Sequence, residues 1–486
     1  MGDANLYGMF AKAGPKPFLV EGDRVLLRYD EIEGAAARIG HRLRSAGAVP
    51  GDRVVAQVEK SPEAVLLYLA CLRAGLVFVP LNTGYTSSEV AYFLGDAEPA
   101  VLVCDGGRKD ALAEVAGPRL AILTLDADGG GSLMNFLGTE MGAAEPRLAE
   151  DLASILYTSG TTGRSKGAML SHGNLAANAR TLCDIWQWRG DDVLLHALPI
   201  YHIHGLFVAL HCALLGGSTV LFHRKFDAAA VVQDLPCASV FMGVPTHYAR
   251  LLEQSSLDAD DFKNMRLFVS GSAPLLEDIF AKFATRTGHK ILERYGMTET
   301  GMIASNPYEG ARVPRTVGYA LPGESVRVAG GNIGVLEVKG PNVFQGYWRM
   351  PKKTAEEFTE DGYFITGDVG MMADDGRISI VGRAKDLIIS GGLNIYPKDI
   401  ELLIDLMPGV TESAVIGVPH ADFGEAVVAV VVGDSSEGEV MAGLDGQLAR
   451  FKQPKRVVFV RELPRNAMGK VQKVALRETY KTLFLT

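Results

Sequence analysis

Residues 61–81 read SPEAVLLYLACLRAGLVFVPL, and this stretch decides the fold class. Ser61, Pro62 and Glu63 indicate a helix start, because a hydroxyl caps free N–H groups, proline fits the first turn and an acid favours the helix N-terminus. The apolar run that follows predicts a buried helix ending at Gly75, and VFVPL then predicts a buried strand. A helix followed directly by a buried strand is the repeating unit of α/β proteins with parallel sheets.

The alternation continues along the chain. Residues 87–104 repeat it, with an apolar helix and then the strand AVLVC. LASILY (152–157) predicts another strand, and Ser171 predicts the cap of the helix after it. Successive units of this kind predict a body built from parallel sheets.

A polar, glycine-rich stretch, GRAKDLIISGG (382–392), interrupts this pattern. Beyond it, Pro397 predicts a helix start, SAVIGVP (413–419) and AVVAVVVGD (426–434) predict strands, and GLDGQLARF (443–451) predicts a second helix. We therefore predict an α/β fold with a large N-terminal body of βαβ units and packed sheets, residues 1–384. A small α+β C-terminal domain, residues 385–486, follows it.

Composition excludes several classes of protein. The 486 residues are 48% hydrophobic and carry a net charge of −9, which indicates a globular chain and disfavours a general nucleic-acid binder. The N-terminus lacks a signal-peptide pattern, and no apolar run is long enough to span a membrane. Five scattered cysteines fit reduced thiols. We expect a cytoplasmic protein.

The loop YTSGTTGRSKGA (157–168) carries the first chemical signal. It contains five serine and threonine hydroxyls, three glycines and two cations. Glycines let backbone N–H groups converge on an anion, and Lys166 adds a point charge suited to phosphate. Because Gly167 follows Lys166, the loop is not a Walker A motif. It predicts a polyphosphate cradle, with a solvated flexible loop as the alternative.

This loop resembles the phosphate-binding signature of the adenylate-forming enzymes, a superfamily of acyl-CoA synthetases, luciferases and peptide-synthetase adenylation domains. Further motifs that resemble those of the family follow in order: ALPIYHIHG (197–205), SGSAPL (270–275), ERYGMTE (293–299), YFITGD (363–368), GRAKDLIISGGLNIYP (382–397) and PRNAMGKVQK (464–473). The resemblance spans nearly the whole chain, so it implies the family's two-step ligation of a carboxylic acid to a thiol. ATP, Mg²⁺ and coenzyme A are the implied cofactors and co-substrate.

The resemblance also implies roles for individual residues. Lys470, a catalytic residue, contacts the acid carboxylate and the α-phosphate during adenylation, which Thr298 and Glu299 assist. Thr158 and Glu299 hold the metal ion, and Lys385 is the hinge about which the small C-terminal domain is mobile. The implied nucleotide-binding and coenzyme-binding residues are Thr158, Ser159, Gly160, Thr161, Thr162, Lys166, Gly271, Ser272, Ala273, Glu293, Tyr295, Gly296, Asp368, Arg383, Gly391 and Gly392.

The acid pocket contains polar groups in otherwise apolar segments. His202 and His204 lie in IYHIHGLFVAL, and Arg250 lies in FMGVPTHYARLL. An arginine that faces an apolar cavity is costly unless an anion pairs with it, so we predict an acid with a second carboxylate. These segments, with Ser272, resemble those of malonyl-CoA synthetases, which act on malonate and in some cases methylmalonate. The alternative for Arg250 is a surface arginine on the helix flank, and for His204 a satisfied core histidine.

Three other functions stay open from the sequence. They are an acyl-CoA synthetase for another short-chain or aromatic acid, an adenylation domain that loads a carrier protein, and a non-catalytic nucleotide-binding protein. No carrier domain follows in this sequence, which disfavours the second. We expect small-molecule substrates without a nucleic-acid or membrane partner, a monomer or homodimer, and lysine acetylation at Lys470 as a family hypothesis.

Overall fold

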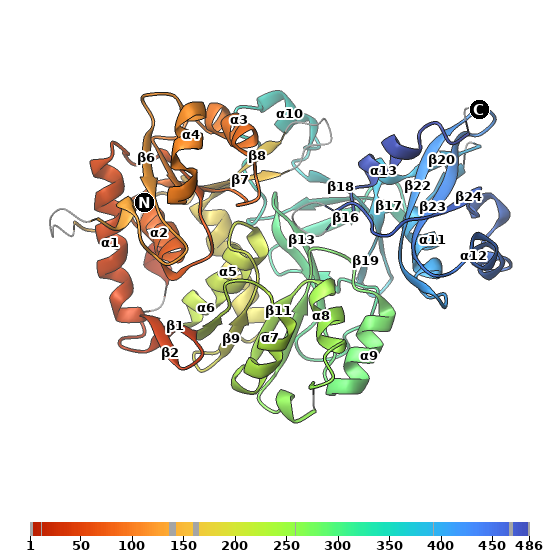
Figure 1. Cartoon of the computed structure of the whole chain (residues 1–486), viewed down its shortest axis with the longest axis horizontal. Helices are drawn as coiled ribbons and strands as arrows, with labels where there is room; N and C mark the ends of the chain where they lie inside the picture. Colours follow the sequence, from red (N-terminus) through yellow and green to blue (C-terminus); the bar gives the residue numbers. More distant parts are fainter. Residues whose placement is uncertain are drawn as a thin grey trace. The chain divides into compact units, whose positions relative to one another are not determined.

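The computed structural model describes residues 3–10, 12–135, 142–158, 165–257, 259–391, 393–465 and 470–484. The chain divides into two compact units (Figure 1). The first comprises residues 1–325 and 338–364, and the second comprises residues 326–337 and 365–486. The predicted α/β class, with a large N-terminal body and a smaller C-terminal domain, is confirmed.

A nine-stranded sheet forms the centre of the first unit. Its order is β15 (Tyr319–Ala320), β14 (Gly301–Ser305), β13 (Leu292–Met297), β12 (Leu267–Ser270), β11 (Val240–Gly243), β9 (Val193–His196), β10 (Thr219–Phe222), β1 (Pro17–Glu21) and β2 (Arg24–Arg28). The pairs from β13 through β1 are parallel, and Gly243 lies opposite Ser270, which lies opposite Glu293. The carboxyl ends of β11, β12 and β13 therefore meet at one edge, where α/β proteins place their ligands.

Helices cover this sheet and build its core. They are α5 (His172–Ile185), the π-helix His204–Leu210, α6 (His211–Gly216), α7 (Ala228–Asp234), α8 (Pro245–Leu252) and α9 (Glu277–Thr287). Figure 1 shows α7, α8 and α9 beside this sheet. Tyr248 of α8 and Phe283 of α9 are fully buried against Phe241 and Phe268 of the strands. This aromatic core fixes the strand ends that carry the site.

A six-stranded sheet forms the rest of the first unit. Its order is β6 (Ala121–Thr124), β5 (Val101–Cys104), β3 (Arg53–Gln57), β4 (Val77–Pro80), β7 (Leu152–Thr158) and β8 (Lys166–Ser171). Its helices are α1 (Tyr29–Ser45), α2 (Pro62–Arg73), α3 (Ser87–Ala97) and α4 (Lys109–Ala116). The predicted βαβ unit is confirmed, because the Ser61 hydroxyl caps α2 and β3 pairs in parallel with β4. The predicted strand at LASILY and the Ser171 cap of α5 are also confirmed.

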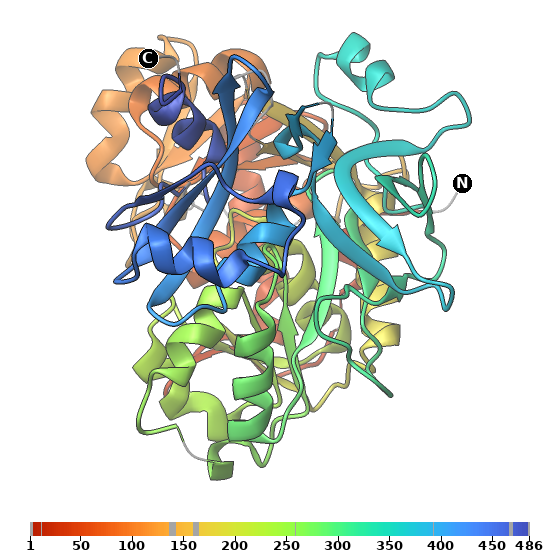
Figure 2. The same ribbon diagram turned by 90° about the vertical axis from the view of Figure 1, so that its right-hand side faces the viewer.

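The second unit holds two smaller sheets. The first contains β16 (Ser325–Val328), β17 (Ile333–Lys339), β18 (Phe364–Met372) and β19 (Ile378–Arg383). The second contains β21 (Leu393–Ile395), β20 (Ile388–Ser390), β23 (Gly424–Gly433) and the edge strand β22 (Val410–His420), with β24 (Arg456–Phe459) paired to β23. Its helices are α11 (Pro397–Ile404), α12 (Glu437–Leu444) and α13 (Lys473–Tyr480). Figure 2 shows the long strands β22 and β23 in blue with helices beside them.

The second unit confirms the predicted strands and corrects one helix. The helix expected over GLDGQLARF is wrong, because α12 ends at Leu444 and only a short 3-10 turn, Arg450–Lys452, follows. Gly446 adopts a φ of +76°, which a continuing right-handed helix does not allow. Ile400 and Val440 pack on one face of the sheet, while Leu476 of α13 packs on the other.

The domain boundary at residues 384 and 385 stays a prediction. The compact division groups β17, β18 and β19 with the C-terminal strands, so it falls earlier in the chain. Compactness measures packing density, whereas the predicted boundary concerns the point about which the chain bends. Within the described ranges, no helix is long and apolar enough to cross a bilayer.

Candidate active site

The predicted metal-binding and phosphate-binding residues meet at the end of β7. Thr158 closes this strand and pairs with Lys166, the first residue of β8. The Thr158 hydroxyl donates to Glu299 Oε1 over 3.3 Å. Glu299, on the turn after β13, is 5% exposed. Ser159, Gly160, Thr161 and Thr162 lie outside the described residues, and their predicted roles stay predictions.

Two residues that the sequence did not single out, Tyr347 and Glu357, connect this group. The Tyr347 hydroxyl lies 3.1 Å from Glu299 Oε1 and 2.8 Å from Glu357 Oε2. Lys166 Nζ lies 2.8 Å from Glu357 Oε1 and 4.0 Å from the centre of the Tyr347 ring. The Tyr347 hydroxyl has one proton to donate, and the Lys166 ammonium stabilises the Glu357 carboxylate.

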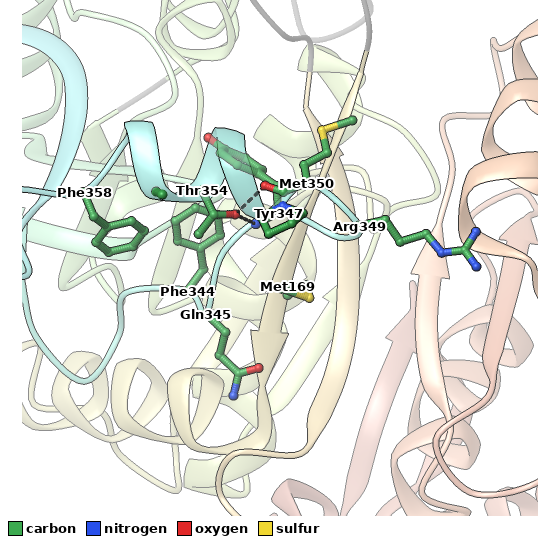
Figure 3. Close-up of a pocket in the computed structure, with 10 residues that line it drawn as sticks. Met169, Phe344, Gln345, Tyr347, Arg349, Met350, Thr354 and Phe358 are labelled. Atoms are coloured by element: carbon green, nitrogen blue, oxygen red, sulfur yellow. Dashed lines mark hydrogen bonds between the residues drawn. The ribbon is translucent and has the colours of Figure 1, made fainter.

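Tyr347 also lines a cavity of about 630 Å³ (Figure 3). The cavity is lined by Met169, Phe344, Gln345, Tyr347, Arg349, Met350, Pro351, Thr354, Ala355 and Phe358. The Thr354 hydroxyl accepts from the Tyr347 N–H over 2.9 Å and holds this segment to helix α10 (Pro351–Glu356). The cavity therefore lies next to the predicted phosphate site without containing any of its predicted residues.

The acid-pocket predictions His204 and Ser272 lie together. The Ser272 hydroxyl lies 3.3 Å from His204 Nδ1. Ser272 adopts a φ of +71°, an unfavourable value for a serine, directly after β12. His204 begins the π-helix and is 3% exposed, and burial holds the pKa of its imidazole well below the usual range. The imidazole is therefore neutral at physiological pH and able to donate or accept a hydrogen bond. His202 is half-buried, with its ring against Tyr201.

Arg294, on β13, is a buried cation beside this pair. Its side chain is 3% exposed, and neither Nε nor Nη2 has a hydrogen-bond partner among the described residues. A Cβ added at Gly271 would lie 2.3 Å from Arg294 Cζ, so the guanidinium packs directly against the loop that carries Ser272. Burial lowers the pKa of Arg294 to about 9. A buried guanidinium with two unsatisfied nitrogens is suited to pair with an anionic ligand.

The sequence contained one signal for Arg294. It lies within ERYGMTE, where Glu293 and Arg294 are adjacent charged residues in a strand that a parallel sheet buries on both faces. Ser270 Oγ and His247 Nδ1 are also buried without hydrogen-bond partners in the described part of the chain. Polar side chains left unsatisfied around one loop indicate a site for a polar ligand.

The structure leaves the prediction that Arg250 faces an apolar cavity untested. Arg250 lies on α8 and is exposed, so solvent stabilises its charge without a bound anion. Its charge adds to burial in lowering the pKa of His247 to about 3. Arg250 is therefore near His247, and its contact with substrate stays a prediction.

The other predicted residues of the first unit lie along β12 and β13. Glu293 is buried, and its Oε2 accepts from the Leu275 N–H over 2.9 Å, which fixes the loop between these residues. Gly271 is buried and Ala273 is exposed, while Tyr295, Gly296 and Thr298 are half-buried. A Cβ at Gly296 would lie 2.1 Å from the Gly301 carbonyl oxygen, so only glycine fits there.

A buried lysine outside all the quoted motifs supports the π-helix. Lys60 Nζ donates to His196 Nδ1 over 2.7 Å and to the carbonyl oxygens of His196 and His223 over 2.9 and 2.6 Å. His196 Nε2 in turn donates to the Gly205 carbonyl oxygen over 3.0 Å, one residue beyond His204. Lys60 thus positions the start of the π-helix through His196.

The second unit carries the remaining predicted residues. Arg383 Nε lies 2.7 Å from Asp368 Oδ1, across the β18–β19 pair, so the two ribose candidates are adjacent. Burial lowers the pKa of Lys385, the predicted hinge. Gly391 has a φ of +58°, and its N–H donates to the Phe423 carbonyl oxygen over 2.8 Å. Lys470 is exposed, and Gly392 lies outside the described residues.

The fold and these groupings define a nucleotide-dependent enzyme built from two units. The chain belongs to the AMP-binding enzyme family, which it matches over residues 10–348, and it matches the family's C-terminal domain over residues 399–470. The predicted resemblance is confirmed.

Several individual members of this family are similar to the chain over most of its length. The ATP-bound crystal structure of MatB from Rhodopseudomonas palustris is 53% identical, with a TM-score of 0.96, and covers 99% of this chain and 100% of that chain. A malonate–CoA ligase of Arabidopsis thaliana is 33% identical over 89% of this chain and 79% of its own length. A feruloyl-CoA synthase of an Amycolatopsis species is 35% identical over 97% of both.

Proposed function

We propose that this enzyme joins malonate to coenzyme A with ATP, through an acyl-adenylate, and releases AMP and pyrophosphate. The observation that carries the choice of acid is Arg294, a buried cation packed against the loop that bears Ser272. Its Nε and Nη2 have no hydrogen-bond partner among the described residues. A short dicarboxylate supplies one carboxylate for activation and a second for this guanidinium. The malonate–CoA ligase of Arabidopsis thaliana and the ATP-bound MatB structure support the proposal.

In the first step, one malonate carboxylate attacks the α-phosphorus of ATP and pyrophosphate leaves. Both reactants are anions, so cations near the reacting atoms lower the barrier. Lys166 lies at the phosphate end of the first unit, and Lys470 has the family role of contacting the carboxylate and the α-phosphate. His204, held neutral by burial, offers a hydrogen bond to the acid without adding charge.

In the second step, the thiol of coenzyme A attacks the acyl carbonyl, loses its proton and displaces AMP. Gly391, with its positive φ, leaves room for a close approach of the backbone to the coenzyme arm. Thr158 and Glu299 fit a Mg²⁺ ion, because they offer a hydroxyl and a buried carboxylate oxygen 3.3 Å apart. The ion would neutralise phosphate charge, in the manner of other nucleotide-dependent enzymes.

Product analysis tests the proposal. The purified enzyme is incubated with malonate, MgATP and coenzyme A, and the products are measured by chromatography and mass spectrometry. We expect malonyl-CoA, AMP and pyrophosphate in equal amounts. Formation of ADP, or the absence of malonyl-CoA while another acid is ligated, would contradict it.

A second candidate is ligation of another short-chain or aromatic acid. The feruloyl-CoA synthase relative favours it, because its identity of 35% is comparable to that of the malonate–CoA ligases, which are 33% identical for Arabidopsis thaliana and 36% for Mus musculus. The two candidates differ in one testable property, since an aromatic acid has no second carboxylate for Arg294. A non-catalytic nucleotide-binding protein would support no reaction with any acid.

Three further proposals concern the cellular state of the protein. We propose a cytoplasmic location, to be tested by fractionation, and a monomer or homodimer, to be tested by light scattering. Acetylation of Lys470 would remove the charge that adenylation uses, and the exposed side chain is accessible to a modifying enzyme. Mass spectrometry that finds Lys470 unmodified while activity changes would count against this regulation.

A further inference from the structure

Helix α13 begins at Lys473, three residues beyond Lys470. Only two residues separate Lys470 from this helix, and backbone contacts hold them in place. The Gln472 N–H donates to the Pro464 carbonyl oxygen over 2.7 Å, and Arg465 and Val471 form a β-bridge. The place of Lys470 in the second unit therefore depends on how α13 is held.

A buried carboxylate on α11 holds the first turn of α13. Glu401 is 5% exposed, and its Oε1 accepts from the Val415 N–H over 2.9 Å, on the edge strand β22. Lys473 Nζ lies 2.5 Å from the same oxygen. Because α11 and α13 pack on opposite faces of this sheet, Glu401 joins the two helices around its edge.

A second ion pair holds the next turn of α13. Arg477 Nη2 lies 2.7 Å from Asp386 Oδ1, and the side chains are 25% and 15% exposed. Asp386 directly follows Lys385, the predicted hinge, on the same 3-10 turn, Ala384–Asp386. Leu476, between the two charged residues of the helix, is 4% exposed and contributes to the core under α13.

We propose that Asp386 and Glu401 are positioning residues that lock α13 to the hinge segment and to α11, and so place Lys470 for adenylation. The inference rests on the proposed function only for the choice of acid. A partly buried, charge-assisted contact of this kind contributes about 1 kcal/mol, which corresponds to roughly a fivefold change in rate.

The test separates the two half-reactions. Arg477→Met is compared with the unaltered enzyme in malonate-dependent pyrophosphate exchange and in thioester formation from the preformed acyl-adenylate. We expect exchange to fall about fivefold and thioester formation to stay within about twofold, because only the first step uses Lys470. The exchanged pair Asp386→Arg with Arg477→Asp restores at least half of the lost exchange. Lys481→Met, which removes only the surface pair with Glu478 on the same helix, is the matched control.

An equal fall in both half-reactions, or no fall in either, would overturn the proposal. Amide hydrogen exchange over residues 470–480 gives a second readout that needs no substrate, with about fivefold faster exchange expected in Arg477→Met and no change in Lys481→Met. If malonate is not the acid, the same half-reactions are measured with the acid that is ligated, so that failure of the proposed substrate leaves this test intact. Unchanged hydrogen exchange would refute the clamp whatever the acid.

Discussion

Replacement of Arg294 by methionine should separate the binding of the second carboxylate from the stability of the fold. Methionine fills most of the volume of the arginine stem and removes its charge. In the unliganded protein the guanidinium is 3% exposed and its Nε and Nη2 have no partners among the described residues. Its charge therefore destabilises the empty site, and a bound carboxylate compensates for it.

The structure gives the size of this effect. Burial lowers the pKa of Arg294 well below the usual range of a guanidinium, to about 9. On the scale at which a tenfold change in an equilibrium equals about 1.4 kcal/mol, the charged form costs about 5 kcal/mol in the empty site. In Arg294→Met the second malonate carboxylate would be buried without its charged partner, which costs about 3 kcal/mol or more of transition-state stabilisation. The value of kcat/KM for malonate should therefore fall by about two orders of magnitude.

Two assays check this prediction. Pyrophosphate exchange is measured for Arg294→Met with malonate and with propionate, which has a similar size and a single carboxylate. We expect malonate turnover to fall about a hundredfold, propionate turnover to be maintained or to rise, and the melting temperature to be unchanged or higher. A variant that loses both acids equally, or that keeps malonate activity, would refute the assignment of Arg294 to the second carboxylate.

Four further predictions follow from individual side chains. Lys470→Ala should abolish pyrophosphate exchange yet leave thioester formation from the preformed adenylate; retained exchange would remove Lys470 from the reaction. Arg250→Met should change KM for malonate by less than about threefold, because solvent already stabilises this exposed arginine, and a hundredfold increase would show that it clamps the substrate. Lys60→Met removes three buried hydrogen bonds and leaves His196 Nδ1 without its donor, so the free energy of unfolding should fall by about 1–3 kcal/mol. KM for the acid should then rise more than KM for MgATP, and equal rises would contradict the positioning role of Lys60. Burial lowers the pKa of His172 to about 4 and of His211 to about 3. Because these histidines bind protons more readily in the unfolded chain, the free energy of unfolding should fall as the pH drops below 6.5, by about 2 kcal/mol for each histidine at pH 5. An unchanged urea midpoint at pH 5 would contradict this.

The fold class was predictable because its signals are local. The Ser61 cap, the apolar run of α2 and the strand β4 follow each other within one short stretch, and each reflects backbone chemistry that tertiary contacts did not override. The helix expected at GLDGQLARF failed for a local reason too, since Gly446 takes a left-handed conformation that ends helical hydrogen bonding. Apolar periodicity alone did not reveal this.

Residues of the candidate site were predictable only where a short sequence motif contains them. The pairing of Asp368 with Arg383 and the contact of Thr158 with Glu299 join residues that the motifs had named. The orientation of the arginine side chains was not predictable. Arg250 and Arg294 both have apolar neighbours in the sequence, and only the structure shows that Arg294 is buried on β13 while Arg250 is exposed on α8. Contacts such as Lys60 with His196 join residues 136 positions apart and leave no trace in the sequence.

The central claim is that the enzyme activates an acid with two carboxylates. The most direct test is ATP–pyrophosphate exchange with the unaltered enzyme over a panel of malonate, methylmalonate, succinate, acetate, propionate, benzoate and ferulate. We predict that malonate gives the highest kcat/KM, at least about tenfold above every monocarboxylic acid. Faster exchange with acetate, benzoate or ferulate than with malonate would contradict the claim.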